Sequence, residues 1–204
     1  MKKLLLVLTI ICSFQNIHSQ EIYCFTGKNY TNYDYKDATG ISNPNLQTGS
    51  GNFYEIGYAM PLSNEKINLA IGLSLNEYNA IGGNTVNSYS WNTQYMGLKS
   101  SISYSLFDRS SFDVAFSAGL TIATLMYGKQ ERNGLFIDLM TQKEFSGVIV
   151  QPFLGFQTSY NISQNGYLSL GYNFSKSFNV TNSTNEKISF INSQLQFGIH
   201  FNIQ

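Results

Sequence analysis

Few residues in this chain belong to the types that carry out chemistry near neutral pH. Its 204 residues include only two histidines, His18 and His200, and two cysteines, Cys12 and Cys24. A zinc site needs about three or four ligands drawn from cysteine, histidine and carboxylate side chains, and this small set does not supply them. The sequence also lacks a glycine-rich phosphate loop, a paired-cysteine motif and a nucleophile elbow. We therefore predict no metal, no cofactor and no catalytic residue, and we expect His200 to be a hydrogen-bonded structural side chain.

The first nineteen residues have the composition of a secretory signal peptide. Two lysines precede the apolar run Leu4–Ile11, which is followed by a short polar stretch ending at Ser19. The apolar run is much shorter than the roughly 20 residues that a membrane-spanning helix needs. We therefore predict a signal peptide over 1–19, export from the cytoplasm, and a single mature domain over 20–204.

The composition is low in charge and rich in aromatic side chains. Charged residues make up 12% of the chain, half of the ~25% that is usual for soluble domains. Aromatic residues make up 15%, and no segment after the N-terminal run could form a spanning helix. Without its first two lysines the chain has 10 basic and 12 acidic side chains (12 − 2 = 10), so it has no excess of positive charge for binding nucleic acid. These features favour a β-barrel in a bacterial outer membrane.

Alternation of apolar and polar residues runs through most of the mature domain. In Ile191–Gln204 an apolar side chain occupies nearly every second position. A period of two places successive side chains on opposite faces of a β-strand, and about ten tilted residues are enough to cross a bilayer. The same pattern predicts eight strands, at 21–33, 54–62, 67–76, 96–106, 112–123, 148–162, 167–180 and 191–204.

The connections between these segments fall into two classes that alternate along the chain. Barrels of the outer membrane have short periplasmic turns, longer outer loops and, with an even number of strands, both termini in the periplasm. We therefore predict an all-β fold, an eight-stranded antiparallel transmembrane up-and-down β-barrel. The short connections are 62–66, 107–111 and 163–166, and the long ones are 34–51, 79–90, 127–146 and 181–187.

A soluble lipocalin-like barrel is the alternative architecture, with the apolar face turned inward around a ligand. The polar face of the predicted strands consists largely of Gly, Ala, Ser and Asn. A soluble exterior usually carries Lys and Glu instead. The membrane barrel is therefore the preferred reading.

The mature domain resembles the small outer-membrane β-barrel family of Bacteroidota, a porin-like family akin to the eight-stranded barrels of outer-membrane proteins A and X. The resemblance rests on the signal ending His18-Ser19-Gln20, on the strand-turn-strand rhythm, and on the closing segment Leu195–Phe201. It implies outer-membrane lipid and the outer-membrane assembly machinery as partners, and it identifies no activity.

Lipid A deacylases resemble this chain in size and are eight-stranded barrels, so a deacylase is an alternative that the resemblance raises. Those enzymes place a serine two residues after the catalytic histidine, whereas here Asn202 follows His200 at that spacing. His200 also shares the parity of the polar, inward face, away from the lipid. We therefore predict that the protein is not an enzyme.

Several charged residues fall on the polar face of the predicted strands. A charge in a narrow lumen is costly alone and tolerable when it is paired. We predict a Glu55–Lys99 or a Glu55–Lys28 ion pair that plugs the interior, with a narrow gated channel as the alternative. The predicted polar network of the lumen is Lys28, Glu55, Lys99, Asp113 and His200.

The loop 127–146 contains apolar residues that an exposed loop does not need. Exposed apolar side chains can mark a contact with a partner or with lipid. The plainer interpretation, which we prefer, is a strand extension above the membrane or a segment packed over the barrel mouth. The candidate contact residues are Leu135, Phe136, Ile137, Leu139 and Met140.

Taken together, these patterns predict a monomeric outer-membrane barrel with a plugged, narrow lumen. Because loops on a rigid scaffold usually carry function, we expect a structural, adhesive or accessory-subunit role through the outer loops. That role would involve an unidentified surface or membrane-protein partner.

Overall fold

A computed structural model describes residues 20–42, 46–62, 66–83, 88–109, 111–181 and 187–203. The predicted signal peptide, 1–19, lies outside the described residues. Among the residues described, no helix is both long enough and apolar enough to cross a membrane.

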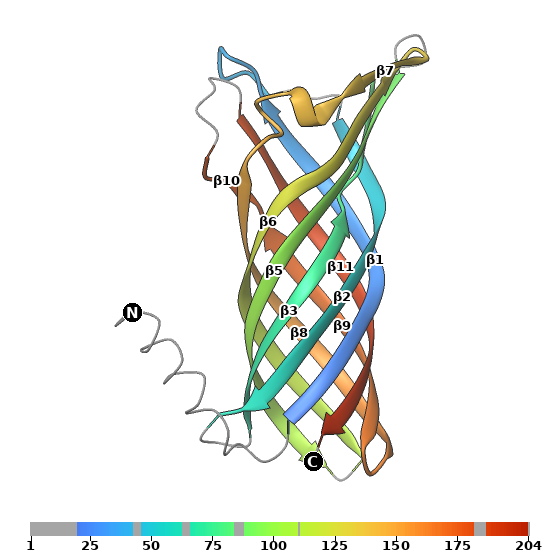
Figure 1. The fold of residues 1–204 in the computed structure, drawn as a ribbon, viewed down its shortest axis with the longest axis vertical. Coiled ribbons are helices and arrows are strands. Elements are labelled where there is room, and N and C mark those ends of the chain that lie inside the picture. Colours follow the sequence, from blue (N-terminus) through green and yellow to red (C-terminus); the bar gives the residue numbers. More distant parts are fainter. Residues whose placement is uncertain are drawn as a thin grey trace, which may run out of the picture.

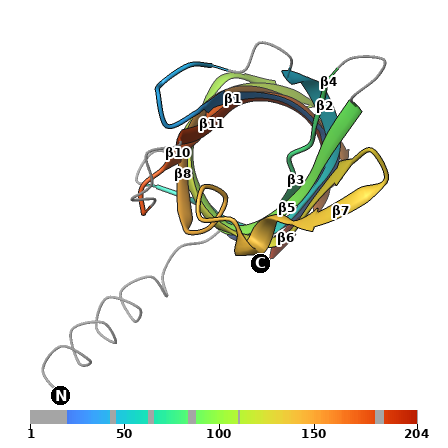
Figure 2. The same ribbon diagram turned by 90° about the horizontal axis from the view of Figure 1, so that it is seen from above.

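Eight long antiparallel strands form a closed ring (Figures 1 and 2). Closure is made by the first and last of them, because β1 (Gln20–Lys36) pairs with β11 (Lys187–Ile203) from Gln20↔Ile203 to Lys36↔Lys187. The ring continues through β2 (Leu46–Pro61), β3 (Ile67–Glu77), β5 (Ser88–Arg109), β6 (Phe112–Arg132), β8 (Val148–Ser163) and β9 (Gly166–Lys176). The predicted eight-stranded antiparallel up-and-down barrel is therefore confirmed.

The two ends of the barrel differ in their connections. Gln20 and Ile203 lie at one end, the terminal end, at the bottom of Figure 1. The short connections β2–β3, β5–β6 and β8–β9 lie at this same end, and the longer connections lie at the other, the loop end. The loop end also carries four short elements, β4 (Ala80–Gly83), β7 (Leu135–Asp138), the 3-10 turn η1 (Leu139–Thr141) and β10 (Phe178–Asn179).

The strands continue further toward the loop end than the sequence pattern indicated. Half of the predicted loop 127–146 is strand, because β6 runs to Arg132 and pairs with β7 as a hairpin. The predicted loop 34–51 likewise contains the ends of β1 and β2. Polar residues occupy both faces at the loop ends of β1, β2 and β6, so alternation is lost there although the hydrogen-bonded ladder continues.

Apolar side chains cover the outside of the ring. The outward residues Ile56, Leu98, Phe116 and Leu154 are 56%, 59%, 57% and 67% exposed. Their neighbours in sequence point inward and are mostly polar, such as Glu55 and Lys99 at 5% and 8%. A soluble lipocalin-like barrel needs the opposite arrangement, so that alternative is wrong for this fold.

Pro152 lies within β8. Proline has no N–H for the ladder. The neighbouring ladder is interrupted here, because β9 pairs with β8 only as far as Phe153↔Ser175 and β10 resumes at Phe178↔Val150. Pro152 thus occupies the gap between two pairing segments.

Candidate functional site in the barrel lumen

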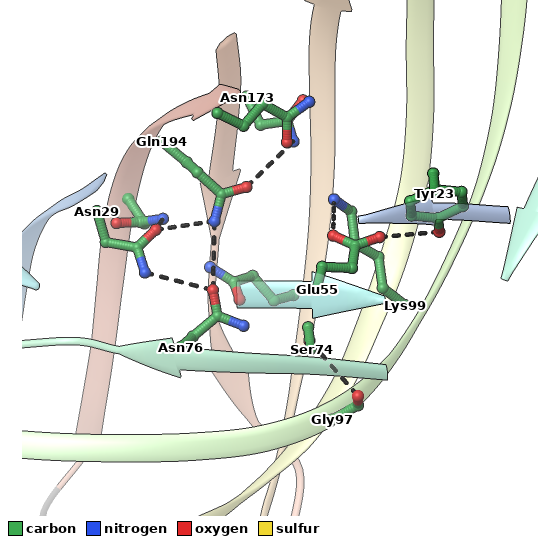
Figure 3. A network of polar contacts seen from close by, with 12 residues as sticks. Tyr23, Asn29, Glu55, Ser74, Asn76, Gly97, Lys99, Asn173 and Gln194 are labelled. Atoms are coloured by element: carbon green, nitrogen blue, oxygen red, sulfur yellow. Dashed lines mark hydrogen bonds and ion pairs between the residues drawn. The ribbon is translucent and has the colours of Figure 1, made fainter. Parts of the chain in front are cut away.

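A buried ion pair joins two strands in the half of the lumen that is nearer to the terminal end. The Lys99 ammonium on β5 donates to Glu55 Oε2 on β2 over 2.7 Å, and the two side chains are 10% and 2% exposed. The Tyr23 hydroxyl on β1 donates to the other carboxylate oxygen, Glu55 Oε1, over 2.9 Å. Figure 3 shows both contacts converging on Glu55 from opposite sides. Of the two predicted pairs, the structure forms Glu55–Lys99.

Two aromatic rings complete the surroundings of the Lys99 ammonium. Its Nζ atom lies 5.5 Å from the ring centroid of Phe53 and 4.9 Å from that of Phe153. A cation within about 6 Å of an aromatic face is attracted to the negative potential of the ring. Lys99 is therefore held by one carboxylate and two rings, which compensates for much of the water it has lost.

Lys28 was assigned wrongly to the lumen. It lies on the outward face of β1 and is exposed, and its Nζ donates to Asn52 Oδ1 over 2.7 Å. Thr26 and Asn32, which share the outward face with Lys28, are also polar. The sequence therefore does not alternate clearly here and does not show which face of β1 is outside. Pairing of Lys28 with the outward Leu195 settles the face.

A layer of amide side chains fills the lumen above the ion pair. Asn29 is fully buried, and its Oδ1 accepts hydrogen bonds from Asn192 Nδ2 and Gln194 Nε2, each at 2.9 Å. Asn76 Oδ1 accepts from Asn29 and Gln194, and Asn173 donates to Gln194 Oε1 over 3.2 Å (Figure 3). The layer joins four strands. Its amides Asn76, Asn173, Asn192 and Gln194 line, together with Lys99 and other side chains, a space of only about 20 Å³, room for roughly one water molecule.

An aromatic cluster, here called the cap, closes over this layer toward the loop end. Phe190 is 2% exposed, and its ring centroid lies 5.0 Å from Tyr33, 4.5 Å from Tyr78 and 6.2 Å from Tyr95. Tilted ring pairs at such distances are favourable beyond the area that they bury. The cap consists of Tyr33, Tyr78, Tyr95, Phe190, Trp91, Ile149 and Ile188, together with Leu139 and Phe145 from the segment that follows β7.

The cap supplies a direct optical test, because Trp91 is the only tryptophan in the chain. Trp91 is 6% exposed, and the Phe145 ring packs edge-on against it at 5.1 Å. We expect Phe145→Ala to shift Trp91 emission to longer wavelength and to increase its quenching by acrylamide, since water then reaches the indole. Phe136→Ala, at an exposed position outside the cap, serves as the control. Equal quenching of the wild type and Phe145→Ala would show that Phe145 does not cover Trp91.

A larger cavity of about 520 Å³ occupies the lumen between the ion pair and the terminal end, and His200 lies in its wall. His200 Nε2 lies 2.7 Å from Ser169 Oγ, and His200 Nδ1 contacts the Glu21 carboxylate. Tyr167 donates its hydroxyl to Glu21 and stacks on the imidazole, with centroids 4.1 Å apart. The predicted hydrogen-bonded lumen histidine is therefore present, with partners that the sequence did not reveal.

Ser169 contacts His200 and His200 contacts Glu21, which is the connectivity of a hydrolase triad. Ser169 is 2% exposed, and β9 is paired on both edges at this residue, with Ser159 of β8 and Gly198 of β11. A triad needs an accessible nucleophile and free N–H donors for the oxyanion. Neither is provided at Ser169.

Asp113 is the remaining predicted lumen residue. It is half-buried on β6 and accepts a hydrogen bond from Ser105 Oγ. It lines the same lower cavity as His200 and Lys99. Asp113 therefore belongs to the lumen, as predicted, and to a contact separate from the Glu55–Lys99 pair.

The predicted outer contact residues divide into two groups. Leu135, Phe136 and Ile137 on β7 are 72%, 61% and 39% exposed, and Met140 on η1 is 48% exposed. Leu139 is only 1% exposed and belongs to the cap, so its assignment to an outer contact was wrong. The favoured alternative, a strand extension with a segment over the barrel mouth, describes this part of the chain.

Among the described residues, no group of three or more His, Cys, Asp or Glu side chains could hold a metal ion. The main lumen residues missed by the sequence reasoning were Glu21, Tyr23, Tyr167 and Ser169, with the amide layer and the cap. All of these residues lie on the inward face of their strands, as the strand pairing shows. The alternation in the sequence does not distinguish them from the other residues on that face.

No protein-family model matches this sequence, and no curated protein matches it. Solved structures do resemble it in fold. Neisserial surface protein A (NspA) superposes with a TM-score of 0.54 at 13% identity, covering 88% of this chain and 96% of that one. The outer-membrane protease OmpT from Escherichia coli gives 0.50 at 9% identity, covering 92% and 98%. The chain therefore has the fold of outer-membrane β-barrel proteins.

Proposed function

We propose that this protein is an integral barrel of the bacterial outer membrane, with a closed lumen and a structural, adhesive or accessory role through its loop end. The observation that carries the proposal is the inverted distribution of side chains. Large apolar residues are exposed around the outside of the ring, while charged and amide side chains are buried within it. In water such a surface would drive aggregation, whereas in a bilayer the apolar band faces hydrocarbon.

A closed lumen is supported by two successive obstructions. The amide layer fills the lumen and leaves a space of only about 20 Å³ beside it, and the cap covers the layer toward the loop end. An eight-stranded barrel is only just wide enough for side chains to fill. The 520 Å³ cavity on the other side of the ion pair would then be a vestibule open to one side of the membrane only.

A role outside catalysis is supported by the buried Ser169 and by the absence of a metal-binding cluster from the described residues. β7 lies beyond the ring in Figure 2, and its exposed apolar side chains are the best candidates for contact with a surface or membrane-protein partner. The lipid and assembly-machinery partners, monomeric state and relationship to Bacteroidota barrels are parts of the same proposal, and they rest on the sequence resemblance.

Planar-bilayer recordings test the closed lumen against the narrow gated channel. We expect the purified barrel to add no stepwise conductance, because solutes would meet the amide layer and then the cap. As a positive control, a variant with Asn29→Ala, Asn76→Ala and Phe190→Ala removes parts of both obstructions and should produce measurable steps if it still folds. Reproducible voltage-dependent steps from the wild type would favour the channel and overturn the closed lumen.

A further inference from the structure

A furrow runs along β1 on the outer wall of the barrel. The outward residues Cys24 and Thr26 are small, and each is flanked by larger side chains on both neighbouring strands. Cys24 lies between Ile199 and Ile56, and Thr26 lies between Phe197 and Tyr54. The resulting apolar groove has a volume of about 540 Å³ and extends across β2 and β3 to β5, within the range of small-molecule sites.

A row of polar side chains borders the groove on its loop-end side. Lys28 donates to Asn52 Oδ1, Asn52 Nδ2 donates to Glu77 Oε2 over 3.0 Å, and Gln94 Nε2 donates to Glu77 Oε1 over 3.2 Å. These four residues lie on β1, β2, β3 and β5, all on the outward face. They form a continuous hydrogen-bonded row, here called the ledge, on the outside of an otherwise apolar wall.

The groove and the ledge are adjacent on every strand that they share. Moving toward the terminal end, the next outward residues after Lys28, Asn52, Glu77 and Gln94 are Thr26, Tyr54, Leu75 and Met96, and all four line the groove. The furrow along β1 thus leads directly to the Lys28 ammonium. An apolar trough that ends at a cation and an anion matches a molecule with a hydrocarbon chain and a charged head.

We propose that this surface binds one phospholipid with a zwitterionic headgroup, its acyl chain in the furrow and its head on the ledge. The inference rests on the proposed membrane location, since hydrocarbon then surrounds the groove and lipid is the available occupant. Lys28 supplies a cation for the phosphate, and Glu77 supplies an anion for the lipid ammonium. A purely anionic headgroup would satisfy Lys28 but would be repelled by Glu77.

Native mass spectrometry of the purified barrel tests the proposal. The barrel is supplied with equal amounts of phosphatidylethanolamine and phosphatidylglycerol that carry identical acyl chains. We expect one phosphatidylethanolamine to remain bound to the wild type in preference to phosphatidylglycerol. Thr26→Phe should lower the lipid-bound fraction about tenfold, because the ring fills the furrow that the acyl chain would occupy.

Ala118→Phe is the matched control. Ala118 is exposed on the outward face of β6, between Ile102 and Leu154, and takes no part in the groove. The Ala118→Phe variant adds the same aromatic ring to the outer wall at a distance from the groove, and it should leave lipid binding unchanged. Glu77→Gln should abolish the preference for phosphatidylethanolamine, because the Glu77 carboxylate distinguishes the two headgroups, and it leaves the furrow intact because Glu77 does not line it.

Equal lipid retention by Thr26→Phe and Ala118→Phe would overturn the inference. So would a preference for phosphatidylglycerol in the wild type, or occupation of the groove by a second copy, seen as a dimer that Thr26→Phe dissociates. Each variant is first checked for recovery in the outer-membrane fraction as a heat-modifiable barrel. If the wild type itself fails that check, the proposed membrane function fails; if it passes and retains no lipid, only this inference fails.

Discussion

Glu55→Ala and Lys99→Ala should each destabilise the barrel by about 3–5 kcal/mol, because each leaves one charge buried without its partner. The two side chains are 2% and 10% exposed, so each charge depends mainly on its protein partner. In Lys99→Ala the carboxylate keeps only the Tyr23 hydroxyl, and in Glu55→Ala the ammonium keeps only the faces of Phe53 and Phe153. Urea unfolding in lipid vesicles measures the loss.

The controls separate a specific pair from a general effect of charge. Lys28→Ala removes an exposed outward lysine and should cost less than about 1 kcal/mol. The double variant Glu55→Gln, Lys99→Met removes both charges and should cost less than the sum of the two single alanine variants, since no unpaired charge remains. If both alanine variants unfolded at the same urea concentration as the wild type, the pair would have no role in stability.

Phe190→Ala should cost a further large amount, about 3–5 kcal/mol, because it opens a cavity at the centre of the cap. Its ring packs against those of Tyr33, Tyr78 and Tyr95, and its backbone N–H donates to Ser177 Oγ over 2.9 Å. The backbone contact survives the substitution, so the loss reports ring packing.

Phe190→Leu is the matched variant. Leucine retains much of the buried volume, so its cost should be clearly smaller than that of alanine. Samples are heated to increasing temperatures in SDS before electrophoresis. The temperature at which the compact form disappears should be highest for the wild type, lower for Phe190→Leu and lowest for Phe190→Ala. Similar temperatures for all three would mean that Phe190 is not packed within the cap.

Sequence periodicity was sufficient to predict the barrel, and the composition of its polar face was sufficient to predict that the apolar face lies outside. Segments such as Ile191–Gln204 bury one face in lipid and one in the lumen, so pattern and structure coincide there. Periodicity failed at Lys28, where the outward face is itself polar, and at the loop end, where the last four residues of β6, Lys129 to Arg132, are polar on both faces. In such places pairing with a neighbouring strand, not the local pattern, decides which way a side chain points.

The candidate site was predictable only in part for a related reason. Charges are rare in this sequence, so Glu55 and Lys99 stood out as residues needing a partner, and the structure joins them. The amide layer and the cap are made largely from Asn, Gln, Tyr, Phe and Ile, which are common throughout the chain. Their convergence depends on the register of strands distant in sequence, as in the contact of Asn29 with Gln194.

Electrophoresis of isolated outer membranes, with and without boiling, tests the central claim most directly. A barrel with its apolar face in lipid should fractionate with the outer membrane. In SDS it should remain folded until heated and change mobility on boiling, because the closed ladder of β1 to β11 resists the detergent. A protein found in the soluble fraction, with the same mobility before and after boiling, would contradict the account.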